Sequence, residues 1–390
     1  MHADTTASAS AIPARPRCVL MTADSVGGVW DYSLQLSAGL ATRGVAVTLA
    51  TMGPPPSAAQ RAAAAAVEGL SVVSRDLRLE WMDAPWSDVD CAGEWLLDLE
   101  SEVGADVVHL NGYAHGCLSW SAPVIVVAHS CVCSWWQAVH GEPAPAAWNP
   151  YRTRVRAGLR SADAVVAPTR TMLAALSAHY GPLGGGVVIP NGRPASALPP
   201  AAKAPLVLAA GRLWDDAKNV RLLASAAPAL TWPVCVAGET RAPDGASATD
   251  WHPAPPGNLH FLGHLSPADL QGWLARAAIY ALPAKYEPFG LTVLEAALAG
   301  CALVLGDIPS LRETWDGAAK FVHPGDRDGL VAAIQSLARE EHRRSGMADR
   351  ARRRAAELSA DRMTSAYIEL YASLRRTPVS LSVEGAPCAS

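Results

Sequence analysis

Two carboxylates eight residues apart, Glu287 and Glu295, stand in the stretch "KYEPFGLTVLEAALAG" at 285–300. The apolar run before it, "AAIYALPA", is typical of a buried strand, so Glu287 is predicted to lie in the Pro- and Gly-bearing turn after that strand. Glu295 would then lie in the following helix, which Gly300 is expected to end. Both acids are therefore expected near the carboxyl end of a strand, where doubly wound α/β sheets bind their ligands.

The start of the same helix is predicted to bind an anion. The backbone N–H groups of Phe289, Gly290 and Leu291 would have no partner within the helix, and helix N-termini attract negative charge. Ionised carboxylates accept hydrogen bonds only, so acids beside this position suit hydroxyl donors. The combination favours a ligand that carries both phosphate and hydroxyl groups. Taken alone, Glu295 also fits an ordinary acid that the helix dipole favours.

A second cluster, "LAAGRLWDDAKNVRLL", places Arg212 just after a predicted strand and Lys218 near the start of the next helix. Arg supplies a fork of donors and Lys a point charge, so the pair suits a diphosphate. Taken alone, an Arg and a Lys six residues apart are usually solvated surface residues. The glycine pair in "SVGGVWDY" would let the backbone approach a ligand, although a plain strand-to-helix turn also uses glycine. Its spacing is not that of a dinucleotide-binding G-x-G-x-x-G loop.

The elements that must position these residues alternate between apolar strands and amphipathic helices. Short apolar runs such as "GADVVHLNG" and "APVIVVAHS" lead into polar or glycine-bearing turns, which is typical of parallel strands. The pattern stops at a Pro- and Ala-rich linker and restarts after it. We therefore predict a disordered tail at 1–16, an N-terminal domain at 17–191, a linker at 192–205, a C-terminal domain at 206–357, a last helix at 358–376 and a tail at 377–390. The last helix has an apolar stripe for packing, formed by Met363, Ala366, Tyr367, Leu370 and Tyr371.

The composition is that of a soluble globular protein. Of 390 residues 50% are hydrophobic and 17% charged, and no apolar run is long enough to span a bilayer. The net charge of −4 offers no argument for nucleic acid. The eight cysteines are scattered, Cys131 and Cys133 lack a second pair at metal-ligand spacing, and the first residues do not resemble a signal peptide. These features predict reduced thiols and a cytoplasmic location.

In combination the clusters make the chain similar to the retaining glycosyltransferases of family 4. The resemblance spans about residues 17–375 and rests on "GG" at Gly27 and Gly28, "VVAHS" with His129, "ADAVVAPT", "VIPNGR", "AAGRLWDDAKN", "VAGE", "FLGHLS" and "EPFGLTVLEAALAGCALVLGDIPSLRE". It implies the GT-B fold, in which two Rossmann-like, doubly wound parallel-sheet domains face each other and a C-terminal helix crosses back. One departure concerns this helix, because many relatives have an aromatic residue where this chain has Ala360 and Asp361.

The resemblance also implies roles for individual residues. Glu287 would contact the donor sugar, Glu295 the ribose hydroxyls, and Arg212 and Lys218 the diphosphate. His129 would face the donor sugar, and we count it with Glu287, Arg212 and Lys218 as catalytic. The donor-binding set comprises Gly27, Gly28, Gly238, Gly263, His264, Leu265, Phe289, Gly290, Leu291, Thr292 and Glu295, with the nucleobase read by backbone groups.

Other candidates carry weaker signals. His109 and Asn111 follow a strand as His129 does, and a lone histidine is often structural. Asp88-Val89-Asp90 and Asp326-Arg327-Asp328 match a D-x-D metal motif, as a chain with 36 acids does by chance, so no catalytic metal is expected. Trp81, Trp86 and Trp95, in a polar and poorly periodic stretch, could stack on sugars or pack in a core. Arg152, Arg156 and Arg160 could touch anionic lipid or form a solvated helix face.

The sequence thus predicts a metal-independent, retaining transferase of hexose from a nucleotide diphosphate sugar to a hydroxyl acceptor such as a glycan or glycolipid. This transferase is expected to need no cofactor, and peripheral contact with a membrane is a further expectation. One alternative is a non-catalytic paralogue that binds a sugar nucleotide as a partner subunit. A GT-B epimerase or phosphorylase fits less well. An epimerase would not need "AAGRLWDDAKN" beside "EPFGLTVLE", and a phosphorylase needs a cofactor lysine that the sequence does not indicate.

Overall fold

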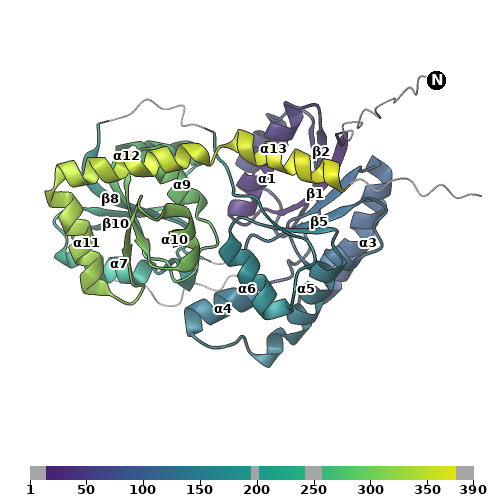
Figure 1. The fold of residues 1–390 in the computed structure, drawn as a ribbon, viewed down its shortest axis with the longest axis horizontal. Helices are drawn as coiled ribbons and strands as arrows, with labels where there is room; N and C mark the ends of the chain where they lie inside the picture. The colour runs from purple at the N-terminus through teal and green to yellow at the C-terminus, as the bar shows by residue number, and fades with distance from the viewer. Residues whose placement is uncertain (1–14, 195–201, 242–256, 375–390) are drawn as a thin grey trace, which may run out of the picture.

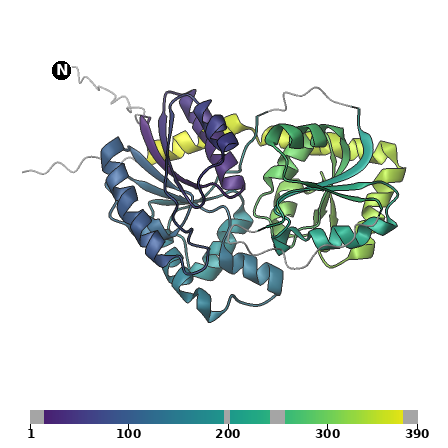
Figure 2. The same ribbon diagram turned by 180° about the vertical axis from the view of Figure 1, so that it is seen from behind.

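The computed structural model describes residues 15–194, 202–241 and 257–374, which Figure 1 colours along the chain. The predicted tail as far as residue 14, the middle of the predicted linker (195–201) and the predicted tail at 377–390 lie outside the described residues. The described residues form two α/β domains, each built on a parallel sheet. Figures 1 and 2 show the two domains side by side, with the last two helices running along both.

The N-terminal domain contains a parallel sheet with the strand order β3-β2-β1-β4-β5-β6-β7. Its strands are β1 (Cys18–Asp24), β2 (Ala46–Met52), β3 (Leu70–Ser74), β4 (Val107–Leu110), β5 (Val124–Val127), β6 (Ala164–Ala167) and β7 (Gly186–Val188). Its helices are α1 (Gly28–Ala41), α2 (Ala58–Ala65), α3 (Trp86–Val103), α4 (Val132–His140), α5 (Asn149–Ser161) and α6 (Arg170–Tyr180). The strand order reverses between β1 and β4, and such switch points are where open α/β sheets bind ligands.

The C-terminal domain contains a parallel sheet with the order β10-β9-β8-β11-β12-β13. Its strands are β8 (Ala204–Ala210), β9 (Val234–Ala237), β10 (Leu259–Gly263), β11 (Ala277–Leu282), β12 (Ala302–Gly306) and β13 (Lys320–Val322). Its helices are α7 (Val220–Ala226), α8 (Pro267–Arg276), α9 (Leu291–Leu298), α10 (Pro309–Trp315), α11 (Arg327–Arg339) and α12 (Glu341–Glu357), with a 3₁₀ turn η3 (Asp216–Lys218) before α7. β8 begins inside the segment predicted as linker.

The strands form because their residues are apolar on both faces. All four residues of β5 and all six of β11 are buried, as expected for strands covered by helices on each side. Gly300 ends α9 with a positive φ of 79°, as its sequence position predicted. Within the described ranges, no helix is long and apolar enough to cross a bilayer.

The last helix, α13 (Ala360–Ser373), returns to the N-terminal domain and packs on α1, which confirms the predicted crossover. Its buried face contains Met363, Tyr367 and Tyr371, three residues of the predicted stripe. At its start, where many relatives have an aromatic residue, Asp361 forms an ion pair with Arg43 of the N-terminal domain. The helix therefore docks without the aromatic residue that many relatives have there.

One stretch differs from the sequence interpretation. The region of Trp86 and Trp95, read as poorly periodic, forms α3, a helix of 18 residues. Val89, Ala92, Leu96 and Leu99 form its buried face. Trp95 is 7% exposed and packs in the core with Leu96 and Leu99, so it has the packing role and not a sugar-stacking one. Trp86 is partly buried and stacks against Arg154, whose guanidinium carbon lies 4.9 Å from the ring centre.

Candidate functional site

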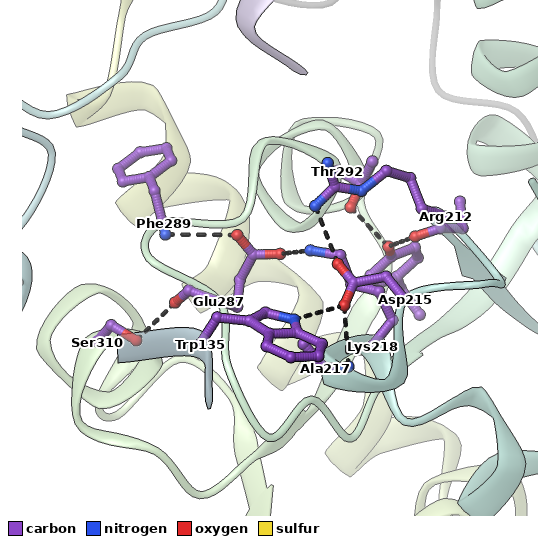
Figure 3. Close-up of polar contacts among 11 residues, drawn as sticks. Trp135, Arg212, Asp215, Ala217, Lys218, Glu287, Phe289, Thr292 and Ser310 are labelled. Atoms are coloured by element: carbon purple, nitrogen blue, oxygen red, sulfur yellow. Dashed lines mark hydrogen bonds and ion pairs between the residues drawn. The ribbon is translucent and has the colours of Figure 1, made fainter. Parts of the chain in front are cut away.

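The turn between β11 and α9 carries Glu287, and the 3₁₀ turn after β8 carries Lys218. The two side chains meet in an ion pair, with Lys218 Nζ 2.6 Å from Glu287 Oε2 and with both side chains less than 15% exposed (Figure 3). A buried ion pair is costly unless further contacts fix its geometry. Such contacts are present, because Lys285 N–H donates to Ala217 O at 2.8 Å and Ser310 Oγ donates to Glu287 O at 2.6 Å. The predicted acid and cation are thus held together on adjoining turns.

Arg212, the second predicted cation, is oriented by Asp215. Its Nη2 lies 2.9 Å from Asp215 Oδ2, while Asp215 Oδ1 accepts hydrogen bonds from Ala217 N–H at 3.0 Å and Trp135 Nε1–H at 2.8 Å (Figure 3). Burial opposes ionisation of Asp215, but the charges of Lys218 and Arg212 and these hydrogen bonds outweigh it, so its pKa lies below the ordinary value. Asp215 is therefore a carboxylate, and the side chain of Arg212 is 38% exposed.

The N-terminus of α9 completes this side of the site. Gly290 precedes the helix with a φ of 88°, a conformation that favours glycine, and a Cβ there would lie 3.0 Å from Val293 Cγ2. Phe289 N–H points at Glu287 Oε1, 3.5 Å away, at the limit of a hydrogen bond. The hydroxyl of Thr292 lies 2.8 Å from that of Tyr280, which is buried in the core and anchors the first turn. The helix thus offers its free first-turn N–H groups beside two cations, an arrangement suited to a diphosphate.

Glu295, the second predicted acid, is paired with an arginine that the sequence analysis did not single out. Arg193 Nε donates to Glu295 Oε1 at 2.7 Å, and these side chains are 12% and 24% exposed. Burial raises the pKa of Glu295, and the positive charge of Arg193 opposes that rise. Arg193 belongs to the segment that connects the domains. Its backbone pairs there with residues 358–360, where the chain returns to the N-terminal domain. Glu295 therefore lies beside both segments that join the two domains.

The glycine loop of the N-terminal domain faces this cluster. A Cβ on Gly27, whose φ is 96°, would lie 3.7 Å from Arg212 Nη1, and one on Gly28 would lie 3.3 Å from Leu291 Cδ1. The loop begins with Asp24 at the end of β1, whose carboxylate accepts a hydrogen bond from Val26 N–H at 2.8 Å. Burial raises the pKa of Asp24 to about 6, against the effects of that N–H group and of Arg212. The loop thus brings a titrating carboxyl group close to the arginine.

Asp24 gives the protein a pH-dependent stability. Because its pKa of about 6 in the folded state exceeds the ordinary 3.8, folding favours the protonated form, and this contribution is lost as the pH rises through 6. Asp24→Asn should therefore unfold a few degrees above the parent protein at pH 7.5 but level with it at pH 4. Thermal unfolding followed by circular dichroism at both pH values measures the difference. An Asp24→Asn protein that is no more stable than the parent at pH 7.5 would contradict the assigned burial cost.

His129 and His109 belong to one buried aromatic network under the loop. His129 Nε2 lies 2.8 Å from Asn111 Oδ1, and its ring meets the ring of Tyr32 edge to face at 4.5 Å. Burial lowers the pKa of His129 to about 4, so this histidine is neutral at pH 7 and cannot supply a fixed positive charge. His109 is fully buried, and its Nδ1 lies 2.6 Å from the hydroxyl of Tyr371 on α13. His109 thus has a structural role between β4 and the crossover helix.

A cavity of about 340 Å³ lies between the domains and reaches Arg212. Besides Arg212, the C-terminal domain lines it with Trp214, Glu239, Arg241 and His264, and the N-terminal domain with the loops around 25–27 and 54–60. Of the residues predicted to bind the donor, this cavity therefore includes Gly27 and His264. The Glu287–Lys218 pair does not line it.

Gly238 and Gly263, also predicted to bind the donor, differ in their surroundings. A Cβ on Gly238 would lie 1.7 Å from Gly211 O, whereas one on Gly263 would meet nothing within 4 Å. Gly238 N–H donates to Gly263 O at 2.8 Å, so both glycines lie side by side at the ends of β9 and β10. Leu265 follows Gly263 and packs partly buried against the core. Close packing of the backbone therefore explains why residue 238 is a glycine.

The remaining candidates lie in other contacts. Asp90 pairs with Arg154, and Asp326 accepts a hydrogen bond from Gly329 N–H at the start of α11, so neither D-x-D match contributes to the site. Arg156 and Arg160 are exposed on α5, and the described residues show nothing that covers them. Among the described residues no three His, Cys, Asp or Glu side chains gather as metal ligands.

Comparison with known proteins assigns each domain to a family. Residues 26–196 match the family described as Glycosyltransferase Family 4, and residues 204–340 match the one described as Glycosyl transferases group 1. Among curated proteins, glycogen synthase of Mycobacterium tuberculosis is 44% identical over 79 residues, which are 20% of this chain and 19% of the relative. Phosphatidyl-myo-inositol mannosyltransferase of Mycolicibacterium smegmatis is 29% identical over 133 residues, 33% of this chain and 34% of the relative. These matches thus span about a third or less of the curated relatives.

Solved structures resemble the whole fold. Sucrose-phosphate synthase from Thermosynechococcus elongatus superposes with a TM-score of 0.76 at 18% identity, over 92% of this chain and 99% of that one. HepE of Anabaena in complex with UDP-glucose gives a TM-score of 0.74 at 16% identity, over 92% and 100% of the two chains. At such identities the similarity establishes the shared two-domain architecture.

Proposed function

The chain belongs to the glycosyltransferases of the family 4 and group 1 type, and from this premise we propose that it moves a hexose from a nucleotide diphosphate sugar to a hydroxyl acceptor. The observation that carries the proposal is the meeting of Glu287, Lys218 and Arg212 beside the N-terminus of α9. Cations and helix N–H groups suit a diphosphate, and a carboxylate beside them suits a sugar. The UDP-glucose bound by HepE and the hexosyl transfer named for the mannosyltransferase relative support a hexose donor.

In the proposed reaction, the cations stabilise the leaving group. The bond between the anomeric carbon and the diphosphate oxygen breaks while the acceptor oxygen bonds to the same carbon from the same face, so the configuration is retained. The acceptor's proton passes to the departing diphosphate. Lys218 has three N–H donors and spends one on Glu287, so it can bind phosphate without releasing the acid. Arg212 and Lys218 supply the charge stabilisation for which other transferases use a metal ion.

Glu287 would act on the sugar. Its carboxylate would stabilise the positive charge that develops near the anomeric carbon as the leaving group departs, because an electrostatic group fixed in advance costs no reorganisation. Glu295 would accept hydrogen bonds from the ribose hydroxyls, since its Oε2 is not used by Arg193. The acceptor would enter from the side of the N-terminal domain, whose glycine loop faces Arg212 and the start of α9.

A thermal-shift screen with UDP, GDP, ADP and dTDP tests the donor site. A ligand that binds only the folded protein raises the unfolding temperature, and 100 times its Kd adds about 2.7 kcal/mol of stability. We expect one of these nucleotides to stabilise the parent protein and to lose this effect in Arg212→Ala and Glu295→Ala. Arg156→Ala, which alters an exposed arginine on α5, is the matched control and should keep the effect.

The result also separates the enzyme from its alternative. Stabilisation by a nucleotide together with sugar transfer to an acceptor supports the transferase. Stabilisation without turnover across a broad acceptor panel would favour the non-catalytic sugar-nucleotide-binding subunit. No stabilisation by any of the four nucleotides would refute the proposed donor site.

A further inference from the structure

Trp135 reaches from the N-terminal domain to the other domain, where it contacts the phosphate clamp, that is, the cations Arg212 and Lys218 with the carboxylate Asp215 that orients Arg212. It lies on α4, and its indole N–H donates to Asp215 Oδ1 of the C-terminal domain at 2.8 Å (Figure 3). The two residues are 80 positions apart in the sequence. Such a hydrogen bond to a carboxylate is stronger than one between neutral groups.

Asp215 transmits this contact to Arg212. Its side chain is only 4% exposed and each oxygen has a partner, Oδ2 the guanidinium of Arg212 and Oδ1 the N–H groups of Trp135 and Ala217. Because the carboxylate is buried, its orientation is set by these donors. Removing the Trp135 N–H would leave Oδ1 with the Ala217 N–H alone, so the carboxylate, and the guanidinium bonded to its other oxygen, would be held less firmly.

Helix α4 also contacts the turn that carries Glu287. Cys131 N–H, at the start of α4, donates to the hydroxyl of Tyr286 at 3.2 Å, and Tyr286 immediately precedes Glu287. Just before the adjoining α6, the hydroxyl of the N-cap residue Thr169 donates to Pro288 O at 3.2 Å. The N-terminal domain thus holds the turn on which Glu287 stands as well as the carboxylate that holds Arg212.

We propose that Trp135 is a positioning residue that acts through Asp215 to fix Arg212 for the diphosphate, so that the N-terminal domain completes the leaving-group clamp of the C-terminal domain. The inference rests on the proposed function, because it assumes that Arg212 binds phosphate. It makes the orientation of a donor-site residue depend on a side chain of the other domain.

Trp135→Phe removes the N–H group and keeps an aromatic ring. We expect it to weaken binding of whichever of UDP, GDP, ADP and dTDP stabilises the parent protein, measured by isothermal titration calorimetry, by about tenfold. Trp136→Phe is the matched control, because Trp136 is the next residue and, like Trp135, packs on His140, while its buried indole N–H has no partner among the described residues. It should bind the nucleotide as the parent does. Thermal unfolding without nucleotide should show similar stabilities for both variants.

A double-mutant cycle identifies the route. Asp215→Asn alone should weaken nucleotide binding, and adding Trp135→Phe to it should cause little further loss, because both changes break one chain of contacts. Additive losses would overturn the route through Asp215. If Trp135→Phe binds nucleotide as well as Trp136→Phe does while the parent protein binds it, the inference alone fails. If the parent protein binds none of UDP, GDP, ADP and dTDP, the proposed donor site fails and the inference falls with it.

Discussion

Replacing Glu287 with Gln is expected to lower turnover of the nucleotide sugar by about 10²–10³-fold, with a much smaller change in nucleotide affinity. Gln has nearly the same shape and keeps an oxygen that can accept from Lys218 Nζ, now 2.6 Å from Glu287 Oε2. It lacks the negative charge, and we propose that this charge acts on the transition state more than on the bound donor. Steady-state kinetics with the nucleotide sugar identified by the thermal-shift screen measures kcat and KM separately.

The control must separate loss of charge from loss of fold. Glu100 is a buried glutamate on α3 of the N-terminal domain that accepts hydrogen bonds from Ser121 and Ala122 N–H groups, outside the clamp. Glu100→Gln should reduce stability and leave kcat unchanged. Near-normal kcat in Glu287→Gln would remove Glu287 from the mechanism, and an equal loss in both variants would indicate that folding alone is affected.

The part of the site that the sequence predicts is the part built from local motifs. Glu287 follows a strand whose six residues are all buried, and Gly290 and Gly300 bound the helix that follows. Apolar runs and glycines with positive φ act within a few residues, so their positions can be read along the chain. Lys218 was found in the same way, from its place between a strand and a helix.

The contacts that orient these residues could not be read from the sequence. Arg193 is 102 residues from Glu295, and Trp135 is 80 residues from Asp215, so no local pattern relates either pair. The Trp135–Asp215 pair forms only because the two domains face each other, and Arg193 reaches Glu295 from the segment that connects them. An arginine in "NGRP" and an aspartate in "WDDAK" have no periodic signal, and charges in turns are commonly solvated.

The helix α3 was missed for a different reason. Its acids and serines outweighed its apolar residues, but Val89, Ala92, Leu96 and Leu99 recur every three or four positions and form its buried face. A search for this period, and not for tryptophans, finds the helix. Polar residues on the other face are what an amphipathic helix requires.

Gly238 shows that packing alone can require a glycine in a motif. Gly238 stands in "VAGE" and was assigned to the donor site by resemblance. In the structure a Cβ on this residue would point at the backbone of the neighbouring turn and lie 1.7 Å from Gly211 O. Its φ of 147° is also one that residues with a Cβ rarely adopt. The close approach of the ends of β8 and β9 therefore accounts for glycine here without any ligand.

Gly238→Ala is expected to destabilise the protein by about 3 kcal/mol or more, from overpacking against a rigid carbonyl plus backbone strain. Thermal or urea unfolding of the purified variant measures this loss, and a variant that does not accumulate in soluble form agrees with it. The neighbouring Gly263, with a φ of 67° and no atom near its Cβ direction, provides the matched control. Gly263→Ala should lose only about 1 kcal/mol.

Nucleotide binding by the two variants then distinguishes packing from recognition. If Gly238 serves packing, the nucleotide should stabilise whatever folded Gly238→Ala protein can be obtained by nearly as much as it stabilises the parent, because the clamp of Arg212 and Lys218 is untouched. If Gly263 exposes its backbone to the base, Gly263→Ala should stay folded yet bind the nucleotide less tightly, since the new methyl group projects into open space at the strand end. A Gly238→Ala protein with parent-like stability would show that the turn shifts easily, and the packing argument would then be wrong.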